Sequence, residues 1–227
     1  MKEFSTIEAL AFDYYGTIAD KQGMGRLVEE LIPGTDGTAL AKLWFQTCQR
    51  YCFQNGMMER YAPWNELTAR ALDFAAAELG VVVPQAARAR LLEADAEAPV
   101  YAEAASALER LAMRFRLYVL SMGELSMIEG SQRRAGIEAH FSGLITTQPD
   151  QVYKPGRAAY QVGVREIGLP PERIGFVSGN SFDVIGAKNF GFPTIWVRRY
   201  GQPLDGLGLE PDLVVDDLAQ MAEALGA

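Results

Sequence analysis

The feature that most constrains this fold is a regular alternation of short apolar runs and helical stretches from about residue 101 to the end of the chain. The apolar runs have the length and composition of strands and lie at 117–120, 144–146, 174–177, 194–197 and 213–215. Strands that alternate with helices predict βαβ units, and therefore a parallel sheet covered by helices on both faces. We predict an α/β fold with a Rossmann-like, doubly wound parallel sheet.

One further strand is expected near the start, because the apolar run 7–12 ends abruptly at Asp13 and a polar turn with a glycine follows. The next block differs from the rest of the chain. It is rich in alanine, and its helical periodicity lies at 39–55, 62–80 and 84–95. We therefore predict a core domain formed by 1–20 and 99–227, with 21–98 inserted as a helical cap domain.

Charge and cysteine content exclude several classes of protein. The formal net charge is −8 and the isoelectric point is about 4.8, which disfavours nucleic acid as a partner because phosphate binding needs a cationic face. No apolar stretch approaches the length of a membrane span. Cys48 and Cys52, four residues apart in a helical stretch, are expected to be reduced thiols, which is typical of a cytoplasmic protein.

Polar side chains gather where the predicted strands end. They are Asp13, Thr17, Ser121, Lys154, Ser178, Asn180 and Asp183. Taken alone, each has an ordinary structural explanation as a turn former, a helix cap or a solvated charge. In an open α/β sheet, however, ligands bind outside the carboxyl ends of the strands, and these positions converge there. We therefore interpret them as one site.

The charged members of this group suggest a nucleophile. Asp13 and Asp183 would repel each other, whereas the ammonium of Lys154 favours the charged form of both. An ion pair near 4 Å is worth about 4 kcal/mol at an effective dielectric constant near 20. Such a pair would keep Asp13 deprotonated, and a deprotonated carboxylate can attack carbon.

Four motifs containing these residues resemble the haloacid dehalogenase superfamily, and within it the L-2-haloacid dehalogenase (type II) branch. They read FDYYGT at 12–17, LSMG at 120–123, VYKPGRAAY at 152–160 and FVSGNSFDVIGAKNFGF at 176–192. Their order and spacing match the family along nearly the whole chain. The fourth motif is the most specific, because its Ser-x-Asn-x-x-Asp pattern is the dehalogenase form.

The resemblance implies a role for each matched residue. Asp13 corresponds to the nucleophile, Lys154 to the lysine that holds it, Thr17 to the residue that supports its carboxylate, and Ser121 to the group that binds the substrate carboxylate. Residues that order the site and the hydrolytic water correspond to Tyr160, Ser178, Asn180 and Asp183. The implied reaction is hydrolysis of a small 2-substituted carboxylic acid through an aspartyl ester, without metal or other cofactor.

The side that receives the leaving group departs from the family pattern. The arginine expected in the cap is Phe45 here, following Trp44, the asparagine after the serine of the second motif is Met122, and Phe182 replaces a common tryptophan. With Tyr14 and Tyr15, these residues predict an apolar, aromatic substrate-binding wall. Tyr15 also occupies the position of the acid/base aspartate of phosphatases, which disfavours phosphatase activity.

Three explanations remain open for this departure. The first is an (S)-2-haloacid dehalogenase whose cap supplies another donor from Gln46, Gln49, Arg50 or Arg60. The second is a hydrolase like L-azetidine-2-carboxylate hydrolase, since an aromatic wall suits a cationic ring amine. The third is a paralogue with little activity, including a non-catalytic binding protein. The resemblance also implies a homodimer formed through cap helices, with a small carboxylic acid as the only other expected partner.

Overall fold

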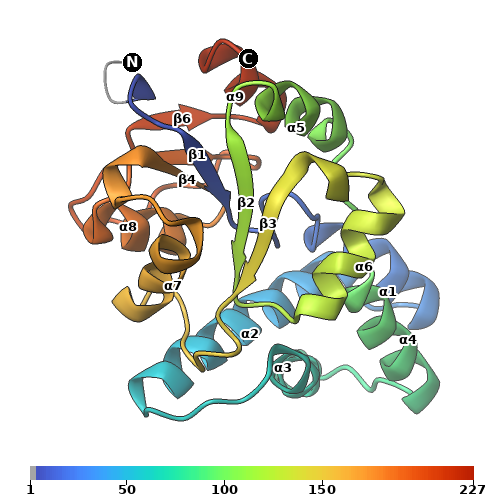
Figure 1. Ribbon diagram of the computed structural model, residues 1–227. Coiled ribbons are helices and arrows are strands. Elements are labelled where there is room, and N and C mark those ends of the chain that lie inside the picture. Colours follow the sequence, from blue (N-terminus) through green and yellow to red (C-terminus); the bar gives the residue numbers. More distant parts are fainter. Residues whose placement is uncertain (1–3) are drawn as a thin grey trace.

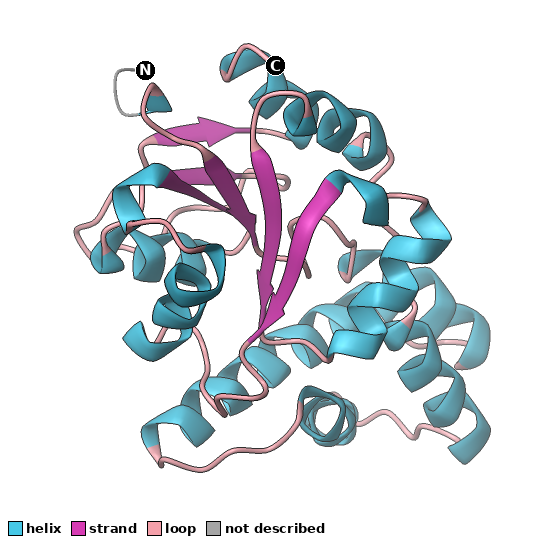
Figure 2. Ribbon diagram, in the orientation of Figure 1, coloured by secondary structure: helices cyan, strands magenta, loops and turns pink. Residues whose placement is uncertain are grey.

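The computed structural model describes residues 4–227 and contains, within that range, a single parallel sheet in the order β3-β2-β1-β4-β5-β6 (Figures 1 and 2). Its strands are β1 (Ala9–Phe12), β2 (Arg116–Ser121), β3 (Phe141–Thr146), β4 (Ile174–Ser178), β5 (Thr194–Val197) and β6 (Leu213–Val215). Every neighbouring pair is parallel. This is the strand order of a doubly wound Rossmann-like sheet, so the predicted fold class is confirmed.

Helices cover both faces of the sheet (Figure 1). Their bounds are α5 (Ala104–Ala112), α6 (Leu125–Ala135), α7 (Arg157–Ile167), α8 (Ser181–Phe190) and α9 (Leu218–Ala224). Side chains of β1 alternate between the faces, as a strand requires. Ala9 and Ala11 pack in the cluster that contains residues of α7 and α8, whereas Leu10 and Phe12 pack with residues of α5, α6 and α9.

A helical layer lies beyond the carboxyl ends of β2 and β3 (Figure 1). It consists of α1 (Gly25–Leu31), α2 (Gly37–Met57), α3 (Trp64–Glu78) and α4 (Gln85–Ala96). The long helix α2 begins where the Asp36 side chain accepts a hydrogen bond from the backbone N–H of Ala39 at 2.9 Å. Such an N-cap satisfies a backbone donor that the first helical turn leaves free.

The two chain segments that join this layer to the sheet run side by side. The N–H of Asp20 donates to the Pro99 carbonyl at 2.7 Å, and the N–H of Tyr101 donates to the Ile18 carbonyl at 2.9 Å. Next to this crossing, the buried ammonium of Lys21 lies 2.5 Å from the Asp95 carboxylate. The entry and exit of the helical layer are therefore fixed to each other at one point of the fold.

A few element boundaries differ from the sequence predictions. β3 begins at Phe141 instead of Leu144. Phe141 pairs with Leu117 and Gly143 pairs with Tyr118, so one residue of β3 is left out of the register between them. β1 begins at Ala9, two residues later than expected. Within residues 4–227, no helix has both the length and the apolar character needed to span a membrane.

Candidate active site

The candidate site lies where the strands of the sheet end, beneath the helical layer. Asp13 directly follows β1, and its backbone N–H donates to the Val177 carbonyl of β4 at 2.8 Å. Ser121 and Ser178 are the last residues of β2 and β4. Lys154 comes from the loop after β3. The parallel topology thus brings together residues that are up to 170 positions apart in the sequence.

Both carboxylate oxygens of Asp13 are held by hydrogen bonds. Oδ1 accepts from the Lys154 ammonium at 3.1 Å. Oδ2 accepts from the Thr17 hydroxyl and from the Asn180 side-chain amide, each at 2.9 Å. Asp13 is 7% exposed. A carboxylate with this set of donors keeps a fixed orientation.

Lys154 is the centre of the charge cluster. Its ammonium donates to the Leu120 carbonyl at 2.6 Å, to Asp183 Oδ2 at 3.0 Å and to Asp13 Oδ1 at 3.1 Å, so all three of its protons are used. Burial disfavours the ammonium, but the carboxylates of Asp13 and Asp183 outweigh burial and raise the pKa of Lys154. Lys154 therefore remains positively charged at neutral pH.

Asp183 lies in the first turn of α8 and is completely buried. Its Oδ1 accepts from the Tyr160 hydroxyl at 2.9 Å. The pKa of Asp183 is raised to about 6, because burial and the negative charge of Asp13 together outweigh the lowering effect of Lys154 and Tyr160. A carboxyl group with a pKa near neutrality is suited to take up and release a proton.

Two glycine-containing loops bring Thr17 and Asn180 to the carboxylate. The Thr17 hydroxyl accepts from the N–H of Gly179 at 2.7 Å while it donates to Asp13. A Cβ on Gly179 would clash with the carbonyl oxygen of Gly16, so only glycine allows the two loops to approach this closely. Ser178 accepts from the backbone N–H of Asn180 at 3.1 Å and so orders the same turn.

Ser121 and Met122 stand on the other side of the cluster. Ser121 is buried, and its hydroxyl oxygen accepts from the N–H of Gly123 at 3.1 Å. That bond leaves the hydroxyl proton free to be donated. The Met122 thioether lies 3.1 Å from the backbone N–H of Lys154 and accepts from it, so Met122 helps to fix the lysine loop.

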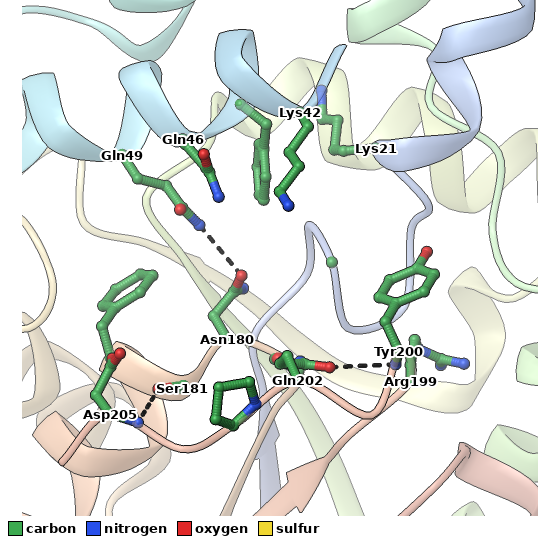
Figure 3. Close-up of a pocket in the computed structure, with 15 residues that line it drawn as sticks. Lys21, Lys42, Gln46, Gln49, Asn180, Ser181, Arg199, Tyr200, Gln202 and Asp205 are labelled. Atoms are coloured by element: carbon green, nitrogen blue, oxygen red, sulfur yellow. Dashed lines mark hydrogen bonds between the residues drawn. The ribbon is translucent and has the colours of Figure 1, made fainter. Parts of the chain in front are cut away.

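A cavity of about 360 Å³ lies between α2 and the segments that follow β4 and β5 (Figure 3). Phe45 and Gln49 of α2 line it, together with Asn180 and Phe182. Gln49 points toward Asn180, and its side-chain amide donates to Asn180 Oδ1 at 3.1 Å (Figure 3). Because the same Asn180 amide group holds Asp13, α2 is linked to the carboxylate through a single residue.

Comparisons with known proteins identify the family of this chain. The model of the haloacid dehalogenase-like hydrolase family matches residues 7–191. The chain belongs to this family. The hydrolase is 34% identical over 220 residues to an (S)-2-haloacid dehalogenase of Pseudomonas putida, covering 96% of each chain. It is 35% identical to haloacetate dehalogenase H-2 of Moraxella sp. (strain B), covering 92% of this chain and 93% of that protein.

Solved structures extend the comparison to the fold of the hydrolase. One L-2-haloacid dehalogenase superimposes with a TM-score of 0.93 at 31% identity, covering 98% of this chain and all of the other. The L-2-haloacid dehalogenase from Xanthobacter autotrophicus with chloropropionic acid covalently bound gives a TM-score of 0.89 at 28% identity, covering 97% of this chain and 99% of that chain.

The aromatic residues predicted to form a substrate wall take different positions in the hydrolase. Phe45 and Phe182 line the cavity. Tyr14 is buried and donates its hydroxyl to Ser131 at 2.8 Å, and burial raises the pKa of Tyr14 to about 12. Trp44 is also buried, and its indole N–H donates to the Thr68 carbonyl at 2.7 Å, within the helical layer. Contact of Tyr14 or Trp44 with a substrate stays a prediction.

The four side chains considered as replacements for the family's arginine lie in different places. Gln46 and Gln49 line the cavity next to Phe45. The guanidinium of Arg50 instead lies 4.8 Å from the ring centre of Phe74. Arg60 lines a second cavity, of about 850 Å³, on the side of the 150–158 loop. Of these four side chains, only Gln46 and Gln49 are placed to face a molecule in the cavity of about 360 Å³.

Three residues around Tyr15 were not identified from the sequence. Trp64, the first residue of α3, stacks on Tyr15 with ring centres 5.8 Å apart. Lys21 lies over the Tyr15 ring, with its ammonium 4.1 Å from the ring centre, and is paired with Asp95. The sequence around these residues contains no pattern from which their contacts could be predicted. Across residues 4–227, no cluster of three or more histidine, cysteine or acidic side chains has the arrangement of a metal site.

Proposed function

We propose that this hydrolase cleaves small (S)-2-halo carboxylic acids and that Asp13 forms a transient ester with the substrate. The observation that carries the proposal is the arrangement around Asp13, whose two carboxylate oxygens are both fixed while Ser121 offers a donor nearby. The identity with curated (S)-2-haloacid dehalogenases over almost the whole chain supports the choice of substrate.

In the first step, an oxygen of Asp13 attacks C2 of the substrate, the bond from C2 to the halogen breaks, and halide leaves with the electron pair. The Ser121 hydroxyl binds the substrate carboxylate. Lys154 donates to Asp13 Oδ1 and fixes its orientation before the attack. Holding nucleophile and carbon in line supplies roughly 7–11 kcal/mol of the barrier in well-oriented reactions.

In the second step, water attacks the carbonyl carbon of the ester on Asp13 and releases a 2-hydroxy acid. Asn180 and Asp183 orient this water, and Asp183 takes its proton. Its raised pKa suits this role. Tyr160 and Ser178 act on the reaction indirectly, because Tyr160 holds Asp183 and Ser178 orders the turn that carries Asn180.

Three further features belong to the proposal. Residues 21–98 act as a cap that closes the site, and 1–20 with 99–227 form the core. The protein is cytoplasmic, which suits its two buried free cysteines. It assembles as a homodimer through cap helices, where Met57 and Met58 are exposed; light scattering coupled to size exclusion tests the assembly directly.

The test is a side-by-side assay of halide release from the (S) and (R) forms of 2-chloro- and 2-bromopropionate, with L-azetidine-2-carboxylate as a further substrate. We expect release from the (S) acids only, with no loss of activity after treatment with a chelator. Ring opening of azetidine-2-carboxylate without halide release would instead support the cyclic-amine alternative, for which the aromatic side chain of Phe45 in the cavity wall is the favourable observation.

A further inference from the structure

Two buried hydrogen-bond donors, one on the loop that carries Asp13 and one at the start of α3, have no partner within residues 4–227. They are the hydroxyl of Tyr15 and the indole N–H of Trp64. Each side chain is 4% exposed. Their rings are stacked, with an interplanar angle of 14°. Tyr15 belongs to the loop after β1, whereas Trp64 begins α3, so the pair joins the core to the helical layer.

An unsatisfied buried donor is costly, at roughly 1–3 kcal/mol each, and native structures contain few of them. The other two tryptophans of this chain follow that rule. The indole N–H of Trp44 donates to the Thr68 carbonyl at 2.7 Å, and that of Trp196 donates to the Gly179 carbonyl at 3.4 Å. Trp64 is therefore the exception among the three, and its ring stacks on Tyr15, two residues after Asp13 in the chain.

The position of Tyr15 ties this pair to the chemistry. Its carbonyl accepts from the Asn180 side-chain amide at 2.9 Å, and the same amide nitrogen donates to Asp13. At Gly123, a Cβ would lie 2.6 Å from the Tyr15 ring and 3.4 Å from the Ser121 hydroxyl. The ring thus extends from the loop of the nucleophile to the loop of the residue that binds the substrate carboxylate.

Trp64 is held in place from the same side. Its backbone N–H donates to the Glu124 carboxylate at 3.0 Å, in the loop that follows β2. This contact fixes the first residue of α3 against the loop that carries Ser121. The indole and the phenol are therefore positioned by the core on both sides and do not depend on a flexible side chain.

We propose that the Tyr15 hydroxyl and the Trp64 indole N–H together receive the halide that leaves C2. This inference rests on the proposed function. As the bond from Asp13 to C2 forms and the carbon–halogen bond breaks, the halogen departs with the electron pair, and the two donors bind the resulting anion. An indole N–H can only donate, so the pair favours an anionic leaving group over a ring ammonium.

The surroundings keep both groups in the donor form. Burial raises the pKa of Tyr15 well above its ordinary value, and the negative charge of Asp95 raises it further. The phenol therefore remains protonated throughout the working range of pH. The Lys21 ammonium lies 4.1 Å from the ring centre, and its charge is balanced by the Asp95 carboxylate with which it is paired. The two neutral donors supply hydrogen bonds at the place where the charge of the halide develops.

The test compares kcat/KM for halide release from (S)-2-chloro-, 2-bromo- and 2-iodopropionate in wild type, Trp64→Phe and Tyr15→Phe. Both substitutions keep the ring and remove only the donor. Tyr118→Phe is the matched control, since it removes a phenol hydroxyl of β2 away from the pair. Inhibition by added chloride provides a second measurement that does not depend on the chemical step.

We expect each of the two variants to lose roughly 10- to 100-fold in kcat/KM with the chloro acid, as for a hydrogen bond to a charged group. The loss should be smaller for bromide and smallest for iodide, because the larger ions concentrate less charge. Chloride inhibition should weaken in parallel, and the control should keep the wild-type ratio of chloride to bromide release.

Two results would overturn the inference, and they are distinguishable. If wild type releases halide but Trp64→Phe and Tyr15→Phe keep the wild-type halide ratio and chloride inhibition, the donor pair has no role while the proposed function stands. If wild type releases no halide from any of these acids, the proposed function fails and this inference fails with it. Should one variant not fold, the other carries the same comparison.

Discussion

The two sides of the site differ in how completely their polar groups are paired. On the core side, Asp13, Lys154 and Asp183 use every charged atom in hydrogen bonds between 2.6 and 3.1 Å. On the side facing the helical layer, aromatic rings dominate, and the donors of Tyr15 and Trp64 are left without a partner among the described residues. The charged groups on the core side are all paired within the protein. The donors on the side of the helical layer are free to bind a group of the substrate.

This difference has a physical explanation in the order of the reaction. The nucleophile must be ionised and oriented before the substrate arrives, so its partners have to belong to the protein. The leaving group acquires charge only as its bond breaks. Groups that bind it need to be free beforehand, which is why unpaired donors are tolerated on that side despite their cost.

The largest effect is expected from removing the nucleophile. Asp13→Asn should lower kcat by at least about 10⁴-fold, because loss of a covalent nucleophile leaves only binding and polarisation. Halide release measured by ion chromatography tests this. Asp73→Asn, which removes an exposed carboxylate paired with Arg88, is the control and should behave as wild type. Turnover of Asp13→Asn near the wild-type rate would contradict the proposal that Asp13 is the nucleophile.

The next largest effect should follow from removing the central cation. Lys154→Met leaves two buried carboxylates facing each other, so we expect it to lower kcat by about 10³-fold and the free energy of unfolding by about 3–5 kcal/mol. Activity and urea denaturation are the two measurements. Normal stability of Lys154→Met would show that Asp13, Lys154 and Asp183 do not form a tightly coupled charge network.

The dependence of kcat and of stability on pH tests the role of Asp183. Because Asp183, the base that we propose, has a pKa of about 6, kcat should fall as pH drops through 6, by roughly tenfold at pH 5. Stability should change in the opposite sense. The folded pKa lies above the unfolded value, so this group contributes stability below about pH 4 that is lost as pH rises through 6.

Tyr160→Phe provides the check on this assignment. The Tyr160 hydroxyl lowers the pKa of Asp183 by donating to its carboxylate. Without that bond, the acidic limb of the kcat profile should move to higher pH. An unchanged limb would assign it to another group.

The smallest effect is expected at the cavity wall. Phe45→Arg adds a cation close to Gln46 and Asn180, and we expect kcat/KM for the chloro acid to rise about two- to tenfold, since a charge near the leaving group is screened in an open cavity. Phe45→Leu, which adds no charge, is the control. No rise in halide release, together with a fall in opening of azetidine-2-carboxylate, would favour the cyclic-amine substrate.

Much of the fold could be predicted from the sequence, because its strands and helices have clear periodicity. The helix 157–167 and the strands 194–197 and 213–215 agree with α7, β5 and β6 to the residue. The short helix α1 was not predicted separately. It spans one glycine and six other residues and has no side-chain N-cap, so little in the local sequence marks it.

The site was predictable to the extent that topology determines it. Asp13, Ser121 and Lys154 end or follow neighbouring strands, and a parallel sheet brings such positions together. Contacts across the helical layer are different. Nothing in the pattern around Trp64 indicates that it stacks on Tyr15, and a buried Lys21 is found only with its partner Asp95, 74 residues away. Such pairs depend on how the two parts of the chain dock.

The most direct test of the covalent mechanism determines where an oxygen atom from water is incorporated. In a single turnover with excess enzyme in ¹⁸O-labelled water, the label should enter the side chain of Asp13, because water attacks the ester at the carbonyl carbon of that residue. Mass spectrometry of the peptide containing Asp13 should therefore show a gain of one ¹⁸O, with unlabelled hydroxy acid as the product. Label in the product and none in Asp13 would mean that water displaces the halide directly, which contradicts the covalent mechanism.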